Sequence, residues 1–335
     1  MTQTQLHKSP GTLTQGSSRQ KIISIPLILF ALFVLALGII SLFTGVYDLS
    51  AENGKEMFFI TRVPRMVSLM LTGAAMALSG LVMQLITQNR FVEPTTTGTI
   101  EWAGLGLILV YVLVPTPSML LRMFGAIVFA FIGTIVFFML PRRIEFKLSL
   151  IVPIIGIMLG SVISAVSTFV GLFFQMSQSL EVWFAGSFAP IQIGQYEFLW
   201  FIILITLAIF FLADRLTVAG LGEDVAVNLG LNYKRITLFG TALIALATGV
   251  VAAVVGYIPF LGLIVPNIVS KFRGDNLRSN LPWVWFSGMA IITLCDIFAR
   301  TIIMPFEVPV SLVLGTVGAV IFIYLLMKDP KAVSK

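Results

Sequence analysis

Three arginines in this chain lie where they could bind an acidic partner. Arg62 and Arg65 stand three residues apart in the sequence Arg-Val-Pro-Arg, just before a long apolar run, and Arg300 ends a later run. A guanidinium group is a planar fork that can hold a carboxylate through two hydrogen bonds. The alternative is that each arginine reaches from a helix end to lipid headgroups. The pattern therefore predicts either a cationic docking site or lipid contact.

Four further polar residues interrupt apolar stretches. Glu101 is expected about one turn into a span, where the free N–H groups of a helix start would stabilise it, or where it could act as a gate. Asp296 precedes Arg300 by one helical turn, so an internal salt bridge is expected, which makes docking through Arg300 less favoured. Gln84 and Asn267 could line a translocation path or join helices by hydrogen bonds.

The sequence offers no metal site and no catalytic centre. It contains one histidine, His7, and one cysteine, Cys295, so a Cys/His metal site cannot form and no cofactor is expected. No G-x-x-x-x-G-K-[ST] run is present, and Gly11 to Gly16 has only part of that spacing. If ATP drives this protein, another chain must bind it. The chain is therefore not expected to be an enzyme.

The composition of the whole chain is typical of a membrane protein. Hydrophobic residues make up 58% of it and charged residues 11%, with a mean hydropathy of +1.03. Soluble domains have roughly a quarter of their residues charged. The fold class expected is therefore an all-α polytopic membrane protein.

About ten transmembrane helices are predicted, since a span needs about 20 apolar residues. The segment Leu261–Val269 is too short to span and is interrupted by Pro259 and Pro266, which predicts a half-helix inside the bundle. The fifth span carries Gly156 and Gly160 at four-residue spacing, which favours close packing of helices. The predicted spans are Ile22–Gly45, Pro64–Ile86, Thr97–Leu113, Met119–Leu140, Leu148–Phe173, Phe198–Ala213, Ile236–Tyr257, Leu261–Val269, Pro282–Met304 and Val308–Met327.

The charges predict the orientation. With the N-terminus inside, 16 of the 21 Lys and Arg residues fall on inner segments, as expected for basic cytoplasmic loops. Arg62, Arg65 and Arg300 are among the five on the outer side. Both termini should be cytoplasmic, in a cytoplasmic membrane. The expected organisation is a disordered tail at 1–20, a single permease domain at 21–328 and a second tail at 329–335.

The cytoplasmic loop 214–235 should contain a short amphipathic helix. Gly222 precedes it, Glu223 and Asp224 occupy the first turn, where they favour the helix dipole, and Gly230 ends it. Val225, Ala226 and Leu229 form a small apolar face. This helix could pack on its own bundle or insert into a groove of a cytoplasmic partner.

The chain resembles the permease subunits of type II ABC importers, which take up vitamin B12, haem and ferric siderophores. The resemblance covers residues 44–327 and is specific in the order of its motifs. These are Arg62-Val-Pro-Arg65, Gly73-Ala74, Ser79-Gly80, Gln84, Gln88-Asn89, Glu93-Pro94, Gly98, Trp183, Gly186-Ser187, Leu221-Gly222-Glu223, Leu229-Gly230, Gly256-x-Ile-Pro-Phe-Leu-Gly-Leu-Ile-Val-Pro266, Gly274-Asp275, Asp296-x-x-x-Arg300 and Glu307-x-Pro309-Val310.

The resemblance implies a type II ABC importer permease fold and a set of partners. These are two cytoplasmic ABC ATPase subunits, an extracytoplasmic siderophore-binding (lipo)protein and a second permease subunit, identical or paralogous. Arg62, Arg65 and Arg300 match the arginines that receive acidic residues of the binding protein. Gly222, Glu223, Asp224, Ala226, Leu229 and Gly230 match the helix seated on the ATPase. Gly156 and Gly160 match a helix that also lines the pathway.

Several positions depart from the common family pattern, among them Arg90, Trp102 and Ser311. Such changes look like the permeases for catecholate or petrobactin-type ferric siderophores. A bare-ion transporter would need Asp, Glu, His or Cys clusters, so a chelated iron cargo is favoured. The alternatives are a haem or vitamin B12 permease, an ion-gradient secondary transporter using Glu101 and Asp296, and an intramembrane enzyme.

Overall fold

The computed structural model describes residues 24–45, 54–140, 151–274 and 277–328, and this part of the chain is helical, with no strand. The predicted tails at 1–20 and 329–335 lie outside it. The elements are α1 (Ile25–Phe43), α2 (Gly54–Met57), the π-helix η1 (Phe58–Arg62), α3 (Val63–Thr87), α4 (Thr99–Leu113), α5 (Met119–Met139), α6 (Ile151–Phe173), α7 (Ser177–Phe184), the 3-10 helix η3 (Tyr196–Trp200), α8 (Phe201–Ala219), α9 (Glu223–Asn228), α10 (Tyr233–Val254), α11 (Leu261–Arg273), α12 (Leu277–Thr301) and α13 (Val310–Lys328).

The prediction of about ten spanning helices is confirmed. Seven helical segments of the described chain are long and apolar enough to cross a membrane, α4 and α13 are shorter apolar helices, and α11 is the expected half-helix. Several boundaries differ from the prediction by a few residues, and α11 continues to Arg273. Helix α8 continues to Ala219, past Asp214 and Arg215. The predicted span ended at these residues because charged side chains lower the hydropathy, but they do not interrupt the backbone hydrogen bonds of a helix. Helix α7 was not predicted as a separate element.

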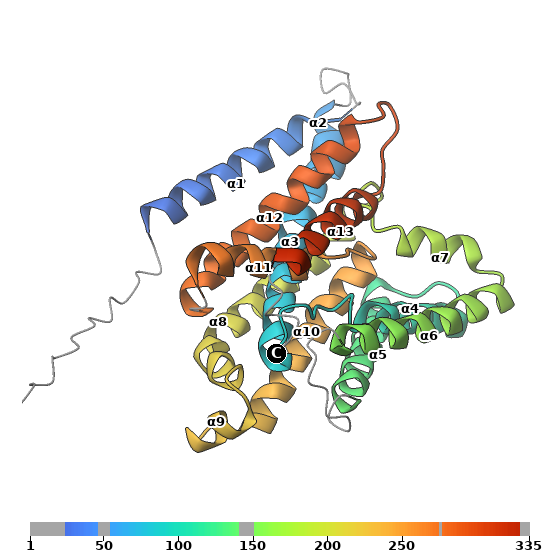
Figure 1. The fold of residues 1–335 in the computed structure, drawn as a ribbon. Coiled ribbons are helices and arrows are strands. Elements are labelled where there is room, and N and C mark those ends of the chain that lie inside the picture. The colour runs from blue at the N-terminus through green and yellow to red at the C-terminus, as the bar shows by residue number, and fades with distance from the viewer. Residues whose placement is uncertain (1–23, 46–53, 141–150, 275–276, 329–335) are drawn as a thin grey trace, which may run out of the picture.

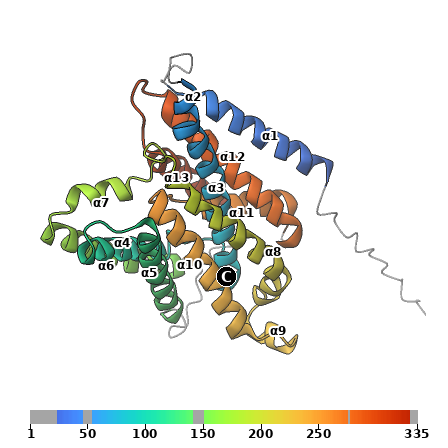
Figure 2. The same ribbon diagram turned by 180° about the vertical axis from the view of Figure 1, so that it is seen from behind.

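Helix α3 is the centre of the molecule. It packs against α12, α10, α11 and α8, and both views show it enclosed by these helices (Figures 1 and 2). Helix α1 lies against α12 on one side, and α4, α5 and α6 form a group on the other side, where α4 and α5 pack against α10. We call the end that carries α2 and the α12–α13 connection the arginine end, and the opposite end, which carries α9, the α9 end.

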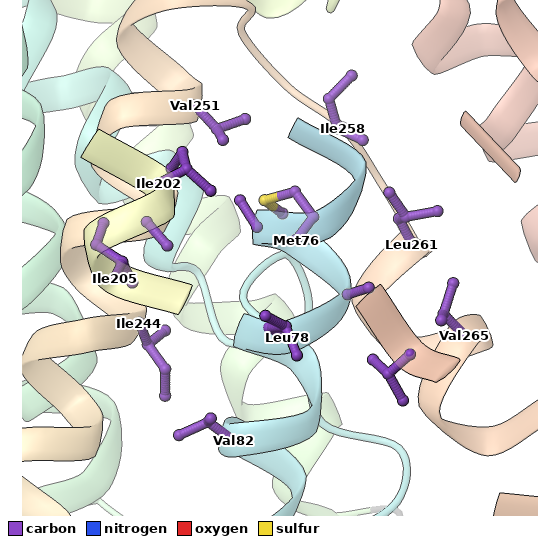
Figure 3. Close-up of a cluster of buried hydrophobic side chains, with 14 of the residues drawn as sticks. Met76, Leu78, Val82, Ile202, Ile205, Ile244, Val251, Ile258, Leu261 and Val265 are labelled. Carbon is purple, nitrogen blue, oxygen red and sulfur yellow. The ribbon is translucent and has the colours of Figure 1, made fainter. Parts of the chain in front are cut away.

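The core forms where α3 meets its neighbours. Figure 3 shows α3, with Met76, Leu78 and Val82, lying between the α8–α10 pair and the start of α11. These three side chains are almost fully buried. Because lipid is as apolar as these side chains, close packing and hydrogen bonds, more than removal of water, hold such helices together.

Pairs of glycines let α3 approach two of its neighbours closely. A Cβ atom placed on Gly73 would lie 2.5 Å from the carbonyl oxygen of Gly288 in α12. A Cβ atom on Gly80 would lie 1.9 Å from the carbonyl oxygen of Gly262 in α11. No side chain fits at either contact, so these glycines fix how α3 lies against α12 and α11.

Candidate functional site

Arg62 and Arg65 lie where a π-helix passes into α3, next to Pro64. Proline has no N–H, so it leaves the carbonyl four residues earlier without its helical partner. That carbonyl belongs to Ile60, and it accepts a hydrogen bond from the backbone N–H of Ile193 at 3.3 Å. The proline between the two arginines thus anchors the 185–195 segment at the arginine end. Arg62 itself donates to the carbonyl of Thr44 at the end of α1.

Arg65 meets Asp296 because of the contact between Gly73 and Gly288. Helices α3 and α12 run antiparallel, and both Arg65 and Asp296 lie eight residues from that contact toward the arginine end, about 12 Å along each helix. Nη2 of Arg65 lies 2.8 Å from Oδ1 of Asp296, and Nε donates to the same oxygen at 3.3 Å. Nη1 of Arg65 pairs with Oε2 of Glu307 at 2.8 Å.

Arg300 completes this ion cluster from below the surface. Its Nη2 lies 2.7 Å from Oδ2 of Asp296, so the predicted salt bridge within α12 is confirmed. The same guanidinium donates to Oγ of Ser41 at 2.7 Å and to the carbonyl of Thr44 at 2.7 Å. Only 2% of Arg300 is exposed. Arg300 is therefore almost closed to a partner in this structure, and its docking role stays a prediction.

A cavity of about 250 Å³ opens beside the ion cluster. Its wall includes all three arginines and Glu307, together with Gly45, Thr61, Ala189, Ile191 and Pro305. The structure thus brings the three predicted docking residues to one recess. It also adds Glu307 and Asp296, which the docking prediction did not include.

Gln84 and Asn267 both attach α11 to its surroundings. Pro266 leaves the carbonyl of Gly262 without a helical N–H, and Nε2 of Gln84 donates to that oxygen at 3.3 Å. Nδ2 of Asn267 donates to the carbonyl of Arg90 at 2.8 Å and to its own helix at Leu263. Both residues line a second cavity, of about 260 Å³. Gln84 thus joins α3 to α11 as the hydrogen-bonding alternative predicted, Asn267 joins α11 to the connection between α3 and α4, and the pathway role of both stays a prediction.

Glu101, Gly156 and Gly160 form a separate group where α4 meets α6. Glu101 lies in the first turn of α4, as predicted. Gly156 and Gly160 are buried against the segment that precedes α4, since a Cβ atom on Gly156 would lie 2.1 Å from the carbonyl oxygen of Thr96. The glycines therefore serve packing within this chain. Glu101 and the two glycines are not among the residues that line the cavity of Gln84 and Asn267, and the pathway role of all three stays a prediction.

Glu93 is a polar residue that the site prediction missed. Its side chain is fully buried, and Oε1 accepts hydrogen bonds from the hydroxyl of Thr95 and, at 2.8 Å, from the backbone N–H of Phe260. Phe260 immediately precedes α11, so Glu93 caps that helix from a segment 167 residues away in the chain. Its signal in the sequence is the Glu93-Pro94 pair of the family pattern, in the polar segment 88–99, to which no role was assigned.

The short helix α9 forms where the sequence predicted it. Gly222 precedes it with a φ of +106°, Glu223 and Asp224 occupy its first turn, and Gly230 follows with a φ of +79°. The predicted apolar face is wrong in one respect, because Ala226 turns inward and is fully buried. Val225 and Leu229 are exposed at the tip of the molecule. This tip stands apart from the other helices (Figure 1).

Gln88 connects α9 to the central helix. It ends α3 in a left-handed conformation, with a φ of +50°, and its Nε2 donates to the carbonyl of Gly220 at 3.2 Å. Helix α3 therefore contacts the ion cluster at one end and the turn before α9 at the other. The described residues contain no group of three His, Cys, Asp or Glu that could hold a metal ion.

Comparison with known proteins gives a consistent set of relatives. The profile of the FecCD transport family matches residues 21–328. The chain is 67% identical to the petrobactin import system permease protein FatD of Bacillus anthracis, over 95% of both chains. It is 39% identical to the petrobactin import system permease protein YclN of Bacillus subtilis, over 90% of this chain and 97% of that one.

More distant relatives share the same architecture. The vitamin B12 import system permease protein BtuC of Escherichia coli is 30% identical, over 95% of this chain and 98% of that one. Among solved structures, a metal-chelate type ABC transporter in an inward-facing conformation superposes with a TM-score of 0.78 at 26% identity. That match covers 90% of this chain and 99% of the other.

Proposed function

The chain belongs to the FecCD transport family, and on this basis we propose that it is the permease subunit of an ABC importer that carries a ferric siderophore into the cell. The cargo class proposed is a petrobactin-type chelate. The subunit forms the multi-pass part of the importer in the cytoplasmic membrane of a bacterium. A separate ATPase subunit hydrolyses the ATP.

One observation carries the cargo assignment. Identity to the petrobactin permease FatD is 67% over 95% of both chains, whereas identity to a vitamin B12 permease is 30%. The lack of a cluster of metal ligands among the described residues is compatible with a chelate.

We assign the arginine end to the outer face and the α9 end to the cytoplasm. The distribution of basic residues supports this orientation, since 16 of the 21 Lys and Arg lie on segments then placed inside. It makes both termini cytoplasmic. The siderophore-binding protein would dock at Arg62 and Arg65, with Arg300 supporting Arg65 through Asp296.

The cytoplasmic partner is assigned to α9. Its exposed residues Val225 and Leu229 offer apolar surface at the tip, and Glu223 and Asp224 place negative charge on the same turn. Such a helix fits a groove on an ATPase subunit. A second permease subunit, identical or paralogous, would complete the membrane part of the importer.

Uptake measurements test this function. A strain lacking the chromosomal permease would receive the wild-type chain or the Arg62→Glu/Arg65→Glu variant, and uptake of iron-55 as ferric petrobactin would be followed. We expect uptake with wild type, and its loss with the variant while the ATPase still co-purifies. A strain that takes up ferric petrobactin equally well without the permease, or that takes up labelled vitamin B12 instead, would contradict the assignment.

A further inference from the structure

The two carboxylates that hold Arg65 differ sharply in accessibility. The side chain of Asp296 is 0% exposed, while that of Glu307 is 32% exposed, and Arg65 itself is 11% exposed. Asp296 occupies Nε and Nη2 of Arg65, and Glu307 occupies Nη1. A carboxylate arriving from outside therefore finds each of the three guanidinium nitrogens already paired with a carboxylate oxygen.

Of the two carboxylates, only Glu307 can leave Arg65 at a small cost in free energy. Asp296 bridges Arg65 and Arg300, at 2.8 and 2.7 Å, so its removal would leave two buried cations without their shared counter-ion. Glu307 lies on the exposed connection between α12 and α13 and pairs at the rim of the cavity. Because the Glu307 side of this pair is open to water, the pair is weaker and exchanges more readily than the buried pairs of Asp296.

We propose that Glu307 is an internal stand-in for an acidic side chain of the extracytoplasmic binding protein, and that docking replaces Glu307 by that side chain on Nη1 of Arg65. This inference rests on the proposed function, since it takes the arginine end as the docking face. Asp296 keeps its bonds throughout, so the exchange conserves the charge around Arg65.

The surroundings of Glu307 indicate what else the partner surface carries. The residues just before it, Ile303, Met304 and Phe306, are all more than half exposed at the arginine end. A partner that covers them removes apolar surface from water. The docking surface therefore fits an acidic side chain surrounded by apolar ones.

The exchange also has a consequence inside the chain. The connection that carries Glu307 is also held next to that residue, where the backbone N–H of Val308 donates to the carbonyl of Ala299 at 3.1 Å, and at the start of α13, where the N–H of Ser311 donates to the carbonyl of Gly186 at 3.2 Å. Glu307 adds a side-chain tie from this connection to α3. Docking breaks that tie and leaves the two backbone bonds in place.

The test is the affinity of the binding protein for the assembled permease–ATPase complex in lipid nanodiscs. Glu307→Gln removes the competitor, and Glu307→Asp keeps its charge but shortens its reach. We expect both to lower the Kd, Glu307→Gln by about fivefold, the factor that corresponds to an exposed ion pair of about 1 kcal/mol. Glu56→Gln, on exposed α2, removes the same charge from the same end and should change the Kd by less than about twofold.

A double-substitution cycle checks the mechanism. In an Arg65→Gln background the effect of Glu307→Gln on the Kd should disappear, because the guanidinium for which Glu307 competes is then absent. Unchanged or weaker binding by both Glu307 variants overturns the stand-in role, as does tighter binding that persists in the Arg65→Gln background. Failure of both variants to assemble overturns it too, since an exchangeable contact is not needed for assembly.

The outcome for the proposed function is separate. If Arg62→Glu/Arg65→Glu abolishes binding while the Glu307 variants have no effect, the docking site stands and only the stand-in role fails. If the charge-reversed chain still binds the binding protein normally, the docking site itself is wrong.

Discussion

Replacing Asp296 by asparagine should be among the most destabilising conservative changes at the arginine end. The side chain is fully buried and lies between two guanidinium groups, with nitrogen–oxygen distances of 2.8 and 2.7 Å. Breaking a buried ion pair by removing one partner typically costs about 3–5 kcal/mol. Asparagine keeps the shape and one acceptor oxygen but removes the charge.

The structure places the cost near the lower end of that range. Arg65 keeps its bond to Glu307, and Arg300 keeps those to Ser41 and Thr44. We therefore expect a loss of about 3 kcal/mol, which lowers the folding equilibrium constant about a hundredfold. The assay is reversible unfolding of the full-length chain in mixed detergent–SDS micelles, followed by tryptophan fluorescence.

Asp214→Asn is the matched control. Asp214 also pairs with an arginine, Arg278, at 2.8 Å, but the two side chains are 68% and 61% exposed. Such a pair contributes about 0–1 kcal/mol. If Asp296→Asn costs no more than Asp214→Asn, the reasoning that burial makes the ion cluster a structural centre is wrong.

Three further predictions address other parts of the molecule. Gly80→Ala should cost about 1–3 kcal/mol and reduce uptake, because a Cβ atom there would overlap the carbonyl of Gly262; thermal unfolding in detergent measures it. Glu93→Ala should cost about 1–2 kcal/mol, because the N–H of Phe260 loses its cap, and the same assay applies. Glu223→Lys should uncouple the ATPase, because it puts positive charge at the start of α9; co-purification and ATP hydrolysis report it.

Each of these has a control in the same chain. Gly315→Ala should be nearly neutral, since a Cβ atom there meets only Pro259, at 3.6 Å; equal losses at Gly80 and Gly315 would count against the close-contact argument. Glu93→Gln keeps an acceptor oxygen and should retain most of the stability, so a loss equal to that of alanine would argue against capping. Normal coupling in Glu223→Lys would contradict the assignment of α9.

The sequence alone determined that the chain lies in a membrane, how many spans it has and where α9 forms. These follow from local properties: the length of each apolar run, the positions of the charges, and the acidic turn between Gly222 and Gly230. The same is true of the pair Asp296 and Arg300, because both residues lie on one helix, one turn apart. Local spacing is enough wherever the partners belong to the same helix.

Only the tertiary structure decided which residues of different helices meet. Arg65 reaches Asp296, 231 residues away, because Gly73 and Gly288 let α3 and α12 touch at one register. Gly80 and Gly262 likewise let α3 and α11 touch. This contact lets Glu93 cap α11, and it lets Gln84 donate to the carbonyl that Pro266 leaves without a helical partner. The arginines were visible in the sequence, but their burial and the carboxylate partners of Arg65 depend on close contact between helices, which spacing along one chain does not encode.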